Sequence, residues 1–331
     1  MQRLIVVYNP NSSQYIHVRD EFLVPVTKLK GFMVGKFAIK KVSFEENLKE
    51  LKKVLKNGDI VIAAGGDATA AVAANAIIES GKDITLGVLP YGNFNDLART
   101  LNTMDTNDIF DYLARVLSPS FSPARTSRGT PYDGATRADI KKLYPLNIVV
   151  DGCHWRYATC YVTMGMTAEA VELFDNPKIR KKMQEGHRSS WRSYVQLATW
   201  YFKNRRKKIF IPRFKLNGIL KHKKTSDYAA VNGRSMSRVM KGGDDYLKPK
   251  VFRSETEQTI KFRKLFVLMA KSILCRVPGI KTSGDLIEFL EPATVELQAE
   301  GEYKVFGNVK TIEIKKSEQY IKVIHGRING K

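Results

Sequence analysis

The feature that most constrains this chain is the stretch "DIVIAAGGDATAAVAANA" at residues 59–76, where an apolar run meets two glycines and then an alanine-rich segment. A short apolar run bounded by glycine predicts a buried strand, and the small-residue segment ending before Gly81 predicts a helix. Glycines between a strand and a helix leave backbone N–H groups accessible to an anion. The stretch therefore predicts a strand–turn–helix unit of an α/β fold, with the turn as a candidate phosphate site.

Two further loops bear on whether this turn binds a ligand or only caps a helix. Taken alone, the turn is equally compatible with a helix whose first N–H groups are capped by Asp67 or Thr69. However, the loop "LPYGNFND" follows the next apolar strand, and "YNPNSS" follows the first strand of the chain. Loops that follow parallel strands meet at one edge of the sheet, where open α/β sheets bind ligands. The three loops together favour a binding site.

Apolar periodicity predicts two kinds of architecture along the chain. In the first part, strands alternate with helices, which predicts a parallel sheet covered on both faces; the elements are strands at 4–8 and near 32–39, helices over 44–55 and 69–80, and a helix from about 96. Later, apolar runs surround Asp151-Gly152 and Asn217-Gly218, which are hairpin signals. The second part is therefore predicted to be mainly antiparallel. Between them, residues 118–144 begin rich in Ser, Pro, Gly and Arg and are interpreted as a linker or insertion.

Charge and cysteine content narrow the classes of partner and compartment. The 331 residues include 55 Lys and Arg against 33 Asp and Glu, a net charge of +22. This balance favours polyanionic partners, namely nucleic acid, nucleotides or an anionic membrane face, although solubility alone is an alternative. No apolar run reaches the roughly 18–20 residues of a membrane span, and "LIVVY" is too short for a signal-peptide core. The three cysteines lack metal-site spacing, which indicates reduced thiols in a cytosolic compartment.

Four motifs resemble those of the diacylglycerol kinase catalytic-domain family. They are "VVYNPNSS", "GGDAT", "LGVLPYGNFNDLARTL" and "AEGE" at 299–302, in the family's order and spacing. The resemblance implies a nucleotide-binding α/β domain at 1–117, completed by about 317–331, and a β-sandwich-like substrate domain at 145–316. It also implies an ATP- and Mg²⁺-dependent kinase that phosphorylates the hydroxyl of a diacylglycerol-like lipid, in phospholipid biosynthesis or related lipid metabolism.

The resemblance also implies roles for particular residues. The phosphates of ATP would lie along Gly65, Gly66, Asp67, Ala68 and Thr69, and Asp67 would act in catalysis by ordering Mg²⁺ through water. Asn9 and the turn containing Gly92, Asn93 and Asn95 would close the nucleotide pocket. Glu302 would deprotonate the acceptor hydroxyl. Such roles suit phosphoryl transfer, which needs charge neutralisation and a positioned hydroxyl beside a carboxylate.

The chain departs from the family pattern at several of these positions. Ala68 stands where the family has glycine, Asn93 where it has threonine, and Glu300 where it has aspartate. If the backbone at Ala68 requires φ > 0, alanine costs about 1–2 kcal/mol there. Ala68 thus favours the alternative function, a catalytically degenerate nucleotide-binding member of the same family. A third alternative, a kinase for a soluble substrate, is disfavoured by Glu302 and by the segment described next.

The segment "SSWRSYVQLATWYFKNRRKK", about 189–208, combines an apolar aromatic helical face with a cationic end. This pattern suits the surface of an anionic membrane, although an ordinary packed helix with a solvated basic tail is the slightly favoured interpretation of the segment alone. A cytoplasmic protein in peripheral contact with an anionic membrane is therefore expected. No nucleic-acid motif accompanies the basic residues, so no nucleic-acid partner is expected, and the oligomeric state is left open, a homodimer included.

Overall fold

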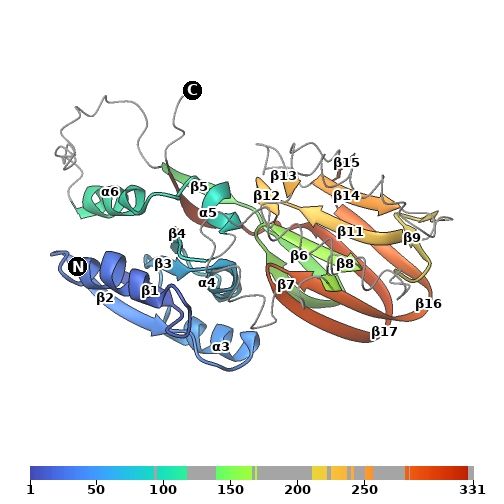
Figure 1. Ribbon diagram of the computed structural model, residues 1–331, viewed down its shortest axis with the longest axis horizontal. Coiled ribbons are helices and arrows are strands. Elements are labelled where there is room, and N and C mark those ends of the chain that lie inside the picture. The colour runs from blue at the N-terminus through green and yellow to red at the C-terminus, as the bar shows by residue number, and fades with distance from the viewer. Residues whose placement is uncertain are drawn as a thin grey trace. The chain divides into compact units, whose positions relative to one another are not determined.

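The computed structural model describes residues 1–92, 95–117, 139–165, 168–169, 211–221, 225–236, 240–241, 250–255, 280–282 and 284–326. The chain divides into two compact units, drawn in Figure 1. The first unit comprises Met1–Tyr144 and Gln319–Lys331, and the second comprises Pro145–Glu318. The first unit is built on a largely parallel sheet with helices, and the second on an antiparallel sheet. The predicted fold class is confirmed.

The sheet of the first unit has six strands in the order β2-β1-β3-β4-β18-β5. All neighbouring pairs from β2 to β18 are parallel, and the edge strand β5 pairs antiparallel with β18. The strands are β1 (Gln2–Tyr8), β2 (Phe32–Ala38), β3 (Ile60–Gly65), β4 (Thr85–Pro90), β5 (Asp139–Leu143) and β18 (Ile321–His325). Strand β5 lies within the expected linker at 118–144; residues 118–138 lie outside the described part of the chain.

Local sequence signals explain the helices that follow β2 and β3. Helix α3 (Phe44–Val54) begins at a capping box, in which Ser43 and Glu46 each bond the other's backbone N–H. Helix α4 (Asp67–Ser80) ends at Gly81, whose left-handed φ of 63° suits glycine. Both helices were predicted from the sequence. Two further helices follow β4, α5 (Asp96–Thr100) and α6 (Thr106–Leu117).

The segment after β1 has an unpredicted form. Helix α1 (Tyr15–His17) runs into a π-helix, η1 (Val18–Leu23), which runs into α2 (Val24–Thr27). Three apolar side chains of η1 are buried: Val18, Phe22 and Leu23. A π-helix widens the turn relative to the usual 3.6 residues, so a 3.6-residue periodicity does not detect it.

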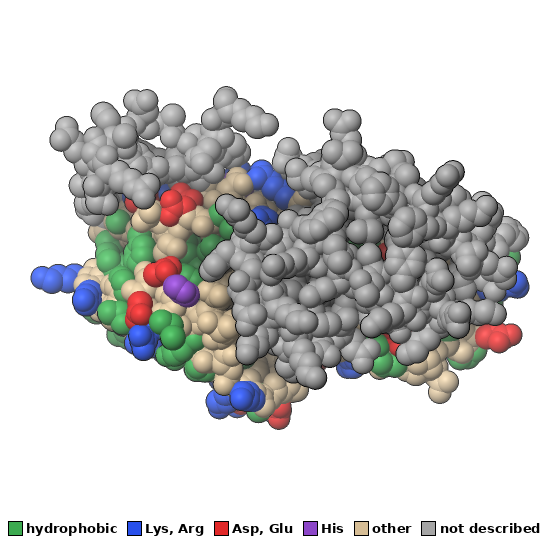
Figure 2. All heavy atoms as spheres, viewed as in Figure 1, with side chains coloured by type: hydrophobic (Ala, Val, Ile, Leu, Met, Phe, Trp, Pro, Cys, Tyr) green, Lys and Arg blue, Asp and Glu red, His purple; other side chains and the backbone are tan. Residues whose placement is uncertain are grey.

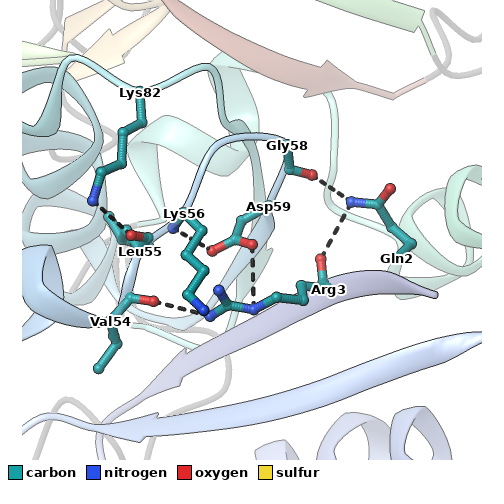
Figure 3. A network of polar contacts seen from close by, with 8 residues as sticks. All are labelled: Gln2, Arg3, Val54, Leu55, Lys56, Gly58, Asp59 and Lys82. Carbon is teal, nitrogen blue, oxygen red and sulfur yellow. Dashed lines mark hydrogen bonds and ion pairs between the residues drawn. The ribbon is translucent and has the colours of Figure 1, made fainter.

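A polar network fastens the amino-terminal edge of this sheet (Figure 3). Asp59 is buried just before β3, where its carboxylate accepts the Lys56 N–H at 2.7 Å and pairs with Arg3 Nε at 3.5 Å. Arg3 Nη2 also donates to the carbonyl oxygen of Val54 at 2.9 Å. The network therefore ties the start of β1 to the end of α3 and the loop before β3.

The second unit contains a ten-stranded sheet, in which the pairs between named strands are antiparallel, and a separate two-stranded one. The strands of the larger sheet are β6 (Leu146–Val150), β7 (Cys153–Ala158), β8 (Tyr161–Gly165), β9 (Phe214–Leu216), β10 (Ile219–Leu220), β11 (Thr225–Val231), β14 (Lys250–Glu255), β15 (Ile280–Lys281), β16 (Gly284–Ala299) and β17 (Glu302–Lys316). The smaller sheet pairs β12 (Ser235–Met236) with β13 (Met240–Lys241).

Three two-residue turns in this unit have φ > 0 at both positions, which is the geometry of a type I′ hairpin. Asp151-Gly152 joins β6 to β7, and Asn217-Gly218 joins β9 to β10, as their sequences predicted. The third, Glu300-Gly301, joins β16 to β17, with φ values of 52° and 93°. Glutamate is an unusual residue for this first position, where Asn, Asp or Gly is favoured.

The expectations of a basic surface and of membrane contact can be compared with the described residues only in part. On the face that Figure 2 shows, the Lys and Arg side chains of the first unit's described residues are scattered rather than gathered in one patch. Among the helices of the described residues, none is both long and apolar enough to cross a membrane. The aromatic and basic segment at about 189–208 lies outside the described residues.

Candidate functional site

The Gly65-Gly66-Asp67 turn joins the carboxyl end of β3 to the first turn of α4. Gly66 is the N-cap residue and has no side chain to cap the helix. Neither glycine has φ > 0, and Ala68 lies inside α4 with its side chain exposed. The backbone therefore imposes no left-handed conformation at Ala68, and the strain considered for that position is absent.

The glycines of this turn are explained by close packing. A Cβ added to Gly65 would lie 2.5 Å from Thr69 Oγ1, so the Thr69 side chain occupies that space. A Cβ added to Gly92 would lie only 2.3 Å from the Gly66 Cα. The two loops thus touch backbone to backbone, and side chains at Gly66 or Gly92 would push them apart. Close packing is therefore one reason for glycine at these positions, beside the predicted one of leaving the backbone open to an anion.

Asp67 joins the same two loops through hydrogen bonds. Its Oδ2 accepts the Asn95 N–H at 3.0 Å, and its Oδ1 accepts the Asp96 N–H at 2.7 Å. The carboxylate therefore caps the start of α5 rather than α4. Asp67 therefore joins the predicted phosphate-binding turn to the predicted closing loop, and the two loops form one assembly.

Asn95 closes its own loop. It has a left-handed backbone with φ of 56°, a conformation that asparagine tolerates better than most residues. Its Oδ1 accepts the Gly92 N–H at 2.7 Å, and its Nδ2 donates to the carbonyl oxygens of Gly92 and Pro90 at 2.7 and 3.0 Å. The buried side chain is thus used in shaping the loop. Asn93, predicted to contact the nucleotide, and Phe94 lie outside the described residues.

The electrostatics of Asp67 are unusual for an aspartate. Burial, followed by repulsion from the neighbouring carboxylate of Asp96, raises its pKa from 3.8 to about 6, against the backbone hydrogen bonds that lower it. The neighbouring carboxylates of Asp67 and Asp96 provide oxygen atoms of the type that Mg²⁺ prefers. Asp67 Oδ2 keeps a lone pair beyond its bond from the Asn95 N–H, whereas Oδ1 also accepts the Leu97 N–H at 3.5 Å. These residues therefore fit a hydrated Mg²⁺, although the described residues contain no cluster of three or more potential ligands.

Asn9 lies at the end of the strand beside β3. Strand β1 pairs with β3 through Tyr8 and Ala64, so Asn9 follows at the level of the glycine turn. Its Oδ1 accepts the Asn11 N–H at 2.9 Å, an Asx turn that directs the chain away from the sheet. Beside it, the rings of Tyr8 and Tyr15 stack with centroids 5.8 Å apart. The third predicted loop is therefore at the same edge.

Tyr91 fixes the second loop from the other side. Its ring is buried in the core of the first unit, and burial raises the pKa of its hydroxyl to about 12. The hydroxyl therefore stays neutral and donates to Glu21 Oε2, 3.2 Å away on η1. The contact links the loop after β4 to the unpredicted π-helix.

Glu302 belongs to the second unit, where it is the first residue of β17 and half-buried. Its neighbour across the turn, Glu300, is 3% exposed. The Glu300 carboxylate accepts hydrogen bonds from the Thr159 hydroxyl and the Cys160 N–H, which hold the strained turn in place. The turn thus presents one buried and one accessible carboxylate.

Two of these residues were not among the predicted site residues, although the sequence contained a signal for each. Asp96 follows Asn95 in the "NFND" loop, and Glu300 is the first acidic residue of "EGE". Both acidic residues are buried. Burial of a charged side chain depends on the packed structure, so the motif alone did not separate them from solvated carboxylates.

A comparison with protein families supports the interpretation of these loops. Residues 3–125 match the family model described as the diacylglycerol kinase catalytic domain. The resemblance stated from the motifs is confirmed. Proteins of Staphylococcus aureus strains JH9 and Newman, each named diacylglycerol kinase, are 32% identical over 156 residues. Each match covers 46% of this chain and 44% of the relative, so the chain matches less than half the length of these curated relatives.

Solved structures resemble the chain over a greater length. A Bacillus anthracis strain Sterne protein provisionally named a diacylglycerol kinase matches with a TM-score of 0.63 at 15% identity, covering 98% of this chain and 97% of the other. A crystal structure of a diacylglycerol kinase from the same organism matches with a TM-score of 0.58 at 12% identity, with the same coverage. At these identities the likeness concerns the fold, and it extends over both units.

Proposed function

We propose that this chain is a lipid kinase that transfers the γ-phosphoryl group of ATP to the hydroxyl of a diacylglycerol-like acceptor. The observation that carries the proposal is the interlocked pair of loops in the matched region, where Gly66 packs on Gly92 and Asp67 bonds the backbone of Asn95 and Asp96. Loops built in this way at the carboxyl edge of a parallel sheet suit a nucleotide.

In this proposal, residues of the first unit bind and orient ATP. The backbone of Gly65, Gly66 and Ala68, with Thr69 at the start of α4, faces the phosphates, because accessible N–H groups and the helix dipole favour negative charge there. Asn9 and the Gly92–Asn95 loop close the pocket. Asp67 holds the two loops in register and would position hydrated Mg²⁺, which supplies charge neutralisation on the phosphates when bound.

Glu302 is proposed as the general base. Its carboxylate accepts the proton of the acceptor hydroxyl while the hydroxyl oxygen forms a bond to the γ-phosphorus. The bond from that phosphorus to the bridging oxygen of ADP breaks, and ADP leaves with the electron pair. A half-buried carboxylate at a hairpin turn suits this role, because it is accessible to a substrate while its backbone is held by the neighbouring Glu300.

The proposed acceptor places the reaction at the cytoplasmic face of an anionic membrane, in lipid metabolism. The net charge of +22 supports attraction to such a surface. The alternative function, a degenerate nucleotide-binding protein, rested on Ala68. Its helical, exposed position gives that alternative no support from backbone strain.

The direct test is a phosphorylation assay. The full-length protein is incubated with γ-labelled ATP, Mg²⁺ and mixed micelles containing diacylglycerol, and the labelled lipid is identified. The proposal expects labelled phosphatidic acid. Binding of Mg·ATP without any labelled product, across diacylglycerol and total membrane lipid, would instead establish the degenerate alternative.

A further inference from the structure

Glu21, on the π-helix η1, carries a carboxylate that is held from two sides and is still accessible to solvent. Its Oε1 lies 3.1 Å from His17 Nδ1, and its Oε2 accepts the Tyr91 hydroxyl at 3.2 Å. The side chain is nonetheless 53% exposed. An ionised carboxylate can accept about four hydrogen bonds, so these two partners leave room for further donors. Glu21 is therefore a positioned and accessible acceptor.

The core of the first unit fixes the place of this carboxylate. Val18, Phe22 and Leu23 of η1 are buried in that core, to which the Tyr91 ring also belongs. A contact between two exposed side chains is weak by itself, whereas here the helix and the tyrosine are both held by packing. The π-helical turn is rare and is frequent at functional sites. The packed core thus sets the distance between Glu21 and the loop after β4.

Tyr91 connects Glu21 with the candidate phosphate turn. It is the first residue after β4, and its N–H donates to the Gly65 carbonyl oxygen at 3.2 Å. The next residue, Gly92, packs against Gly66. The Glu21 carboxylate therefore lies one tyrosine side chain away from the turn at which the phosphates are proposed to bind. The sugar of a nucleotide adjoins its phosphates, so a carboxylate at this place can reach the sugar.

We propose that Glu21 accepts hydrogen bonds from the ribose hydroxyls of ATP, and so selects ribonucleotides over 2′-deoxyribonucleotides. This inference rests on the proposed binding of ATP at the glycine turn. Ribose hydroxyls can donate, and an ionised carboxylate only accepts. A carboxylate takes the same role toward the ribose 2′-hydroxyl in other open α/β sheets. Its negative charge repels phosphates, so Glu21 suits the neutral sugar and not the triphosphate.

The test measures the affinity of the full-length protein for Mg·ATP and for Mg·2′-deoxyATP by isothermal titration calorimetry. Wild-type protein is expected to bind the deoxynucleotide about tenfold more weakly, since a hydrogen bond to a charged group is lost. Glu21→Ala should bind Mg·ATP more weakly and the two nucleotides equally. Tyr91→Phe keeps the carboxylate but removes one of its two partners, so it should reduce the preference by a smaller factor.

Asp20→Ala is the matched control. Asp20 precedes Glu21 on η1, its side chain is 54% exposed, and its removal changes the net charge by the same amount. This variant should keep the wild-type preference for Mg·ATP. Glu21→Gln preserves the shape of the side chain and should also reduce the preference, so it replaces Glu21→Ala if that variant does not fold.

The outcomes separate this inference from the proposed function. Equal wild-type affinity for the two nucleotides, or a preference that survives in Glu21→Ala, would overturn the role of Glu21 while leaving ATP binding and the kinase proposal intact. A preference lost equally in Asp20→Ala would overturn it as well, because the effect would then come from net charge alone. Failure of the wild-type protein to bind either nucleotide would contradict the proposed function itself.

Discussion

At the scale of single residues, Gly92 carries the tightest steric constraint in the candidate site. A methyl group there would meet the Gly66 Cα at 2.3 Å, far inside contact distance. Gly92→Ala should therefore separate the two loops and lower kcat/KM by about 10²-fold, because small displacements of phosphate-positioning groups are costly in phosphoryl transfer. Steady-state kinetics measure this. Gly307→Ala is the control, since a Cβ at that position meets nothing within 4 Å, and it should be indistinguishable from wild type.

Asp67 predicts a particular pH dependence. Because its folded pKa, about 6, lies above the ordinary 3.8, the folded state binds this proton more tightly than the unfolded state does. The stability contributed by Asp67 is therefore fully present below about pH 4 and is lost as the pH rises through about 6. Chemical denaturation from pH 4 to 7 should show this loss in the wild-type protein, and Asp67→Asn should flatten it. An unchanged slope in the variant would assign the titration to another group.

Ala68 offers a test of whether its methyl group obstructs ATP. The residue already has a helical backbone, so Ala68→Gly relieves no strain and should cost up to about 1 kcal/mol through lower helix propensity. Activity should stay within about twofold of wild type, a change that corresponds to less than about 1 kcal/mol of activation free energy. Thermal unfolding and the lipid assay measure the two effects. A large gain in activity would mean that the exposed methyl group had blocked the phosphates.

At the scale of elements, the network at the amino-terminal edge of the first sheet separates stability from function. Asp59→Asn replaces one carboxylate acceptor with a donor, and the N–H of Lys56 or the Arg3 pair loses its partner. The variant should lower the free energy of unfolding by about 1–3 kcal/mol. Urea denaturation measures this loss, and KM for ATP should not change because the glycine loops lie at the opposite edge. Asp20→Asn, which breaks an exposed pair with Arg19, should leave the urea midpoint essentially unchanged.

The same scale shows which elements the sequence could predict. Helix α4 was evident because strand, glycine turn, alanine helix and Gly81 all gave consistent signals, and the Asn217-Gly218 hairpin was evident from its dipeptide. Strand β5 was missed because "DIKKL" has only two apolar residues and follows a Ser- and Pro-rich segment. The alternation typical of a strand is weak there, and its pairing with β18 depends on distant sequence.

The candidate site was predictable to a similar extent. The three loops could be placed at one edge because parallel strands fix their direction. The hydrogen bond from the Asp96 N–H to Asp67 could not be predicted, because it depends on how two loops far apart in the sequence pack together. The resemblance supplied Glu302, whereas the burial of Glu300 became visible only with the packed hairpin.

At the scale of the whole molecule, the proposed division of labour between the units can be measured. Glu302→Gln removes the proposed base from the second unit while the proposed ATP-binding loops belong to the first. Turnover should fall by about 10²–10⁴-fold, and the thermal shift caused by Mg·ATP should be retained. Glu313→Gln, on the same strand but in a surface pair with Lys315, should keep full activity. Near-normal turnover in Glu302→Gln would remove that residue from the mechanism.

The place of β18 between β4 and β5 has a consequence for the order of events during protein synthesis. The strands of the second unit leave the ribosome before residues 321–325 do, so its sheet can form while β4 still lacks its neighbour. Until then β4 has an open edge in a sheet of buried apolar strands, the kind of surface that pairs with other chains. The unit that is encoded first is therefore completed only after the second has been made, and a chain cut short before residue 321 keeps that edge exposed.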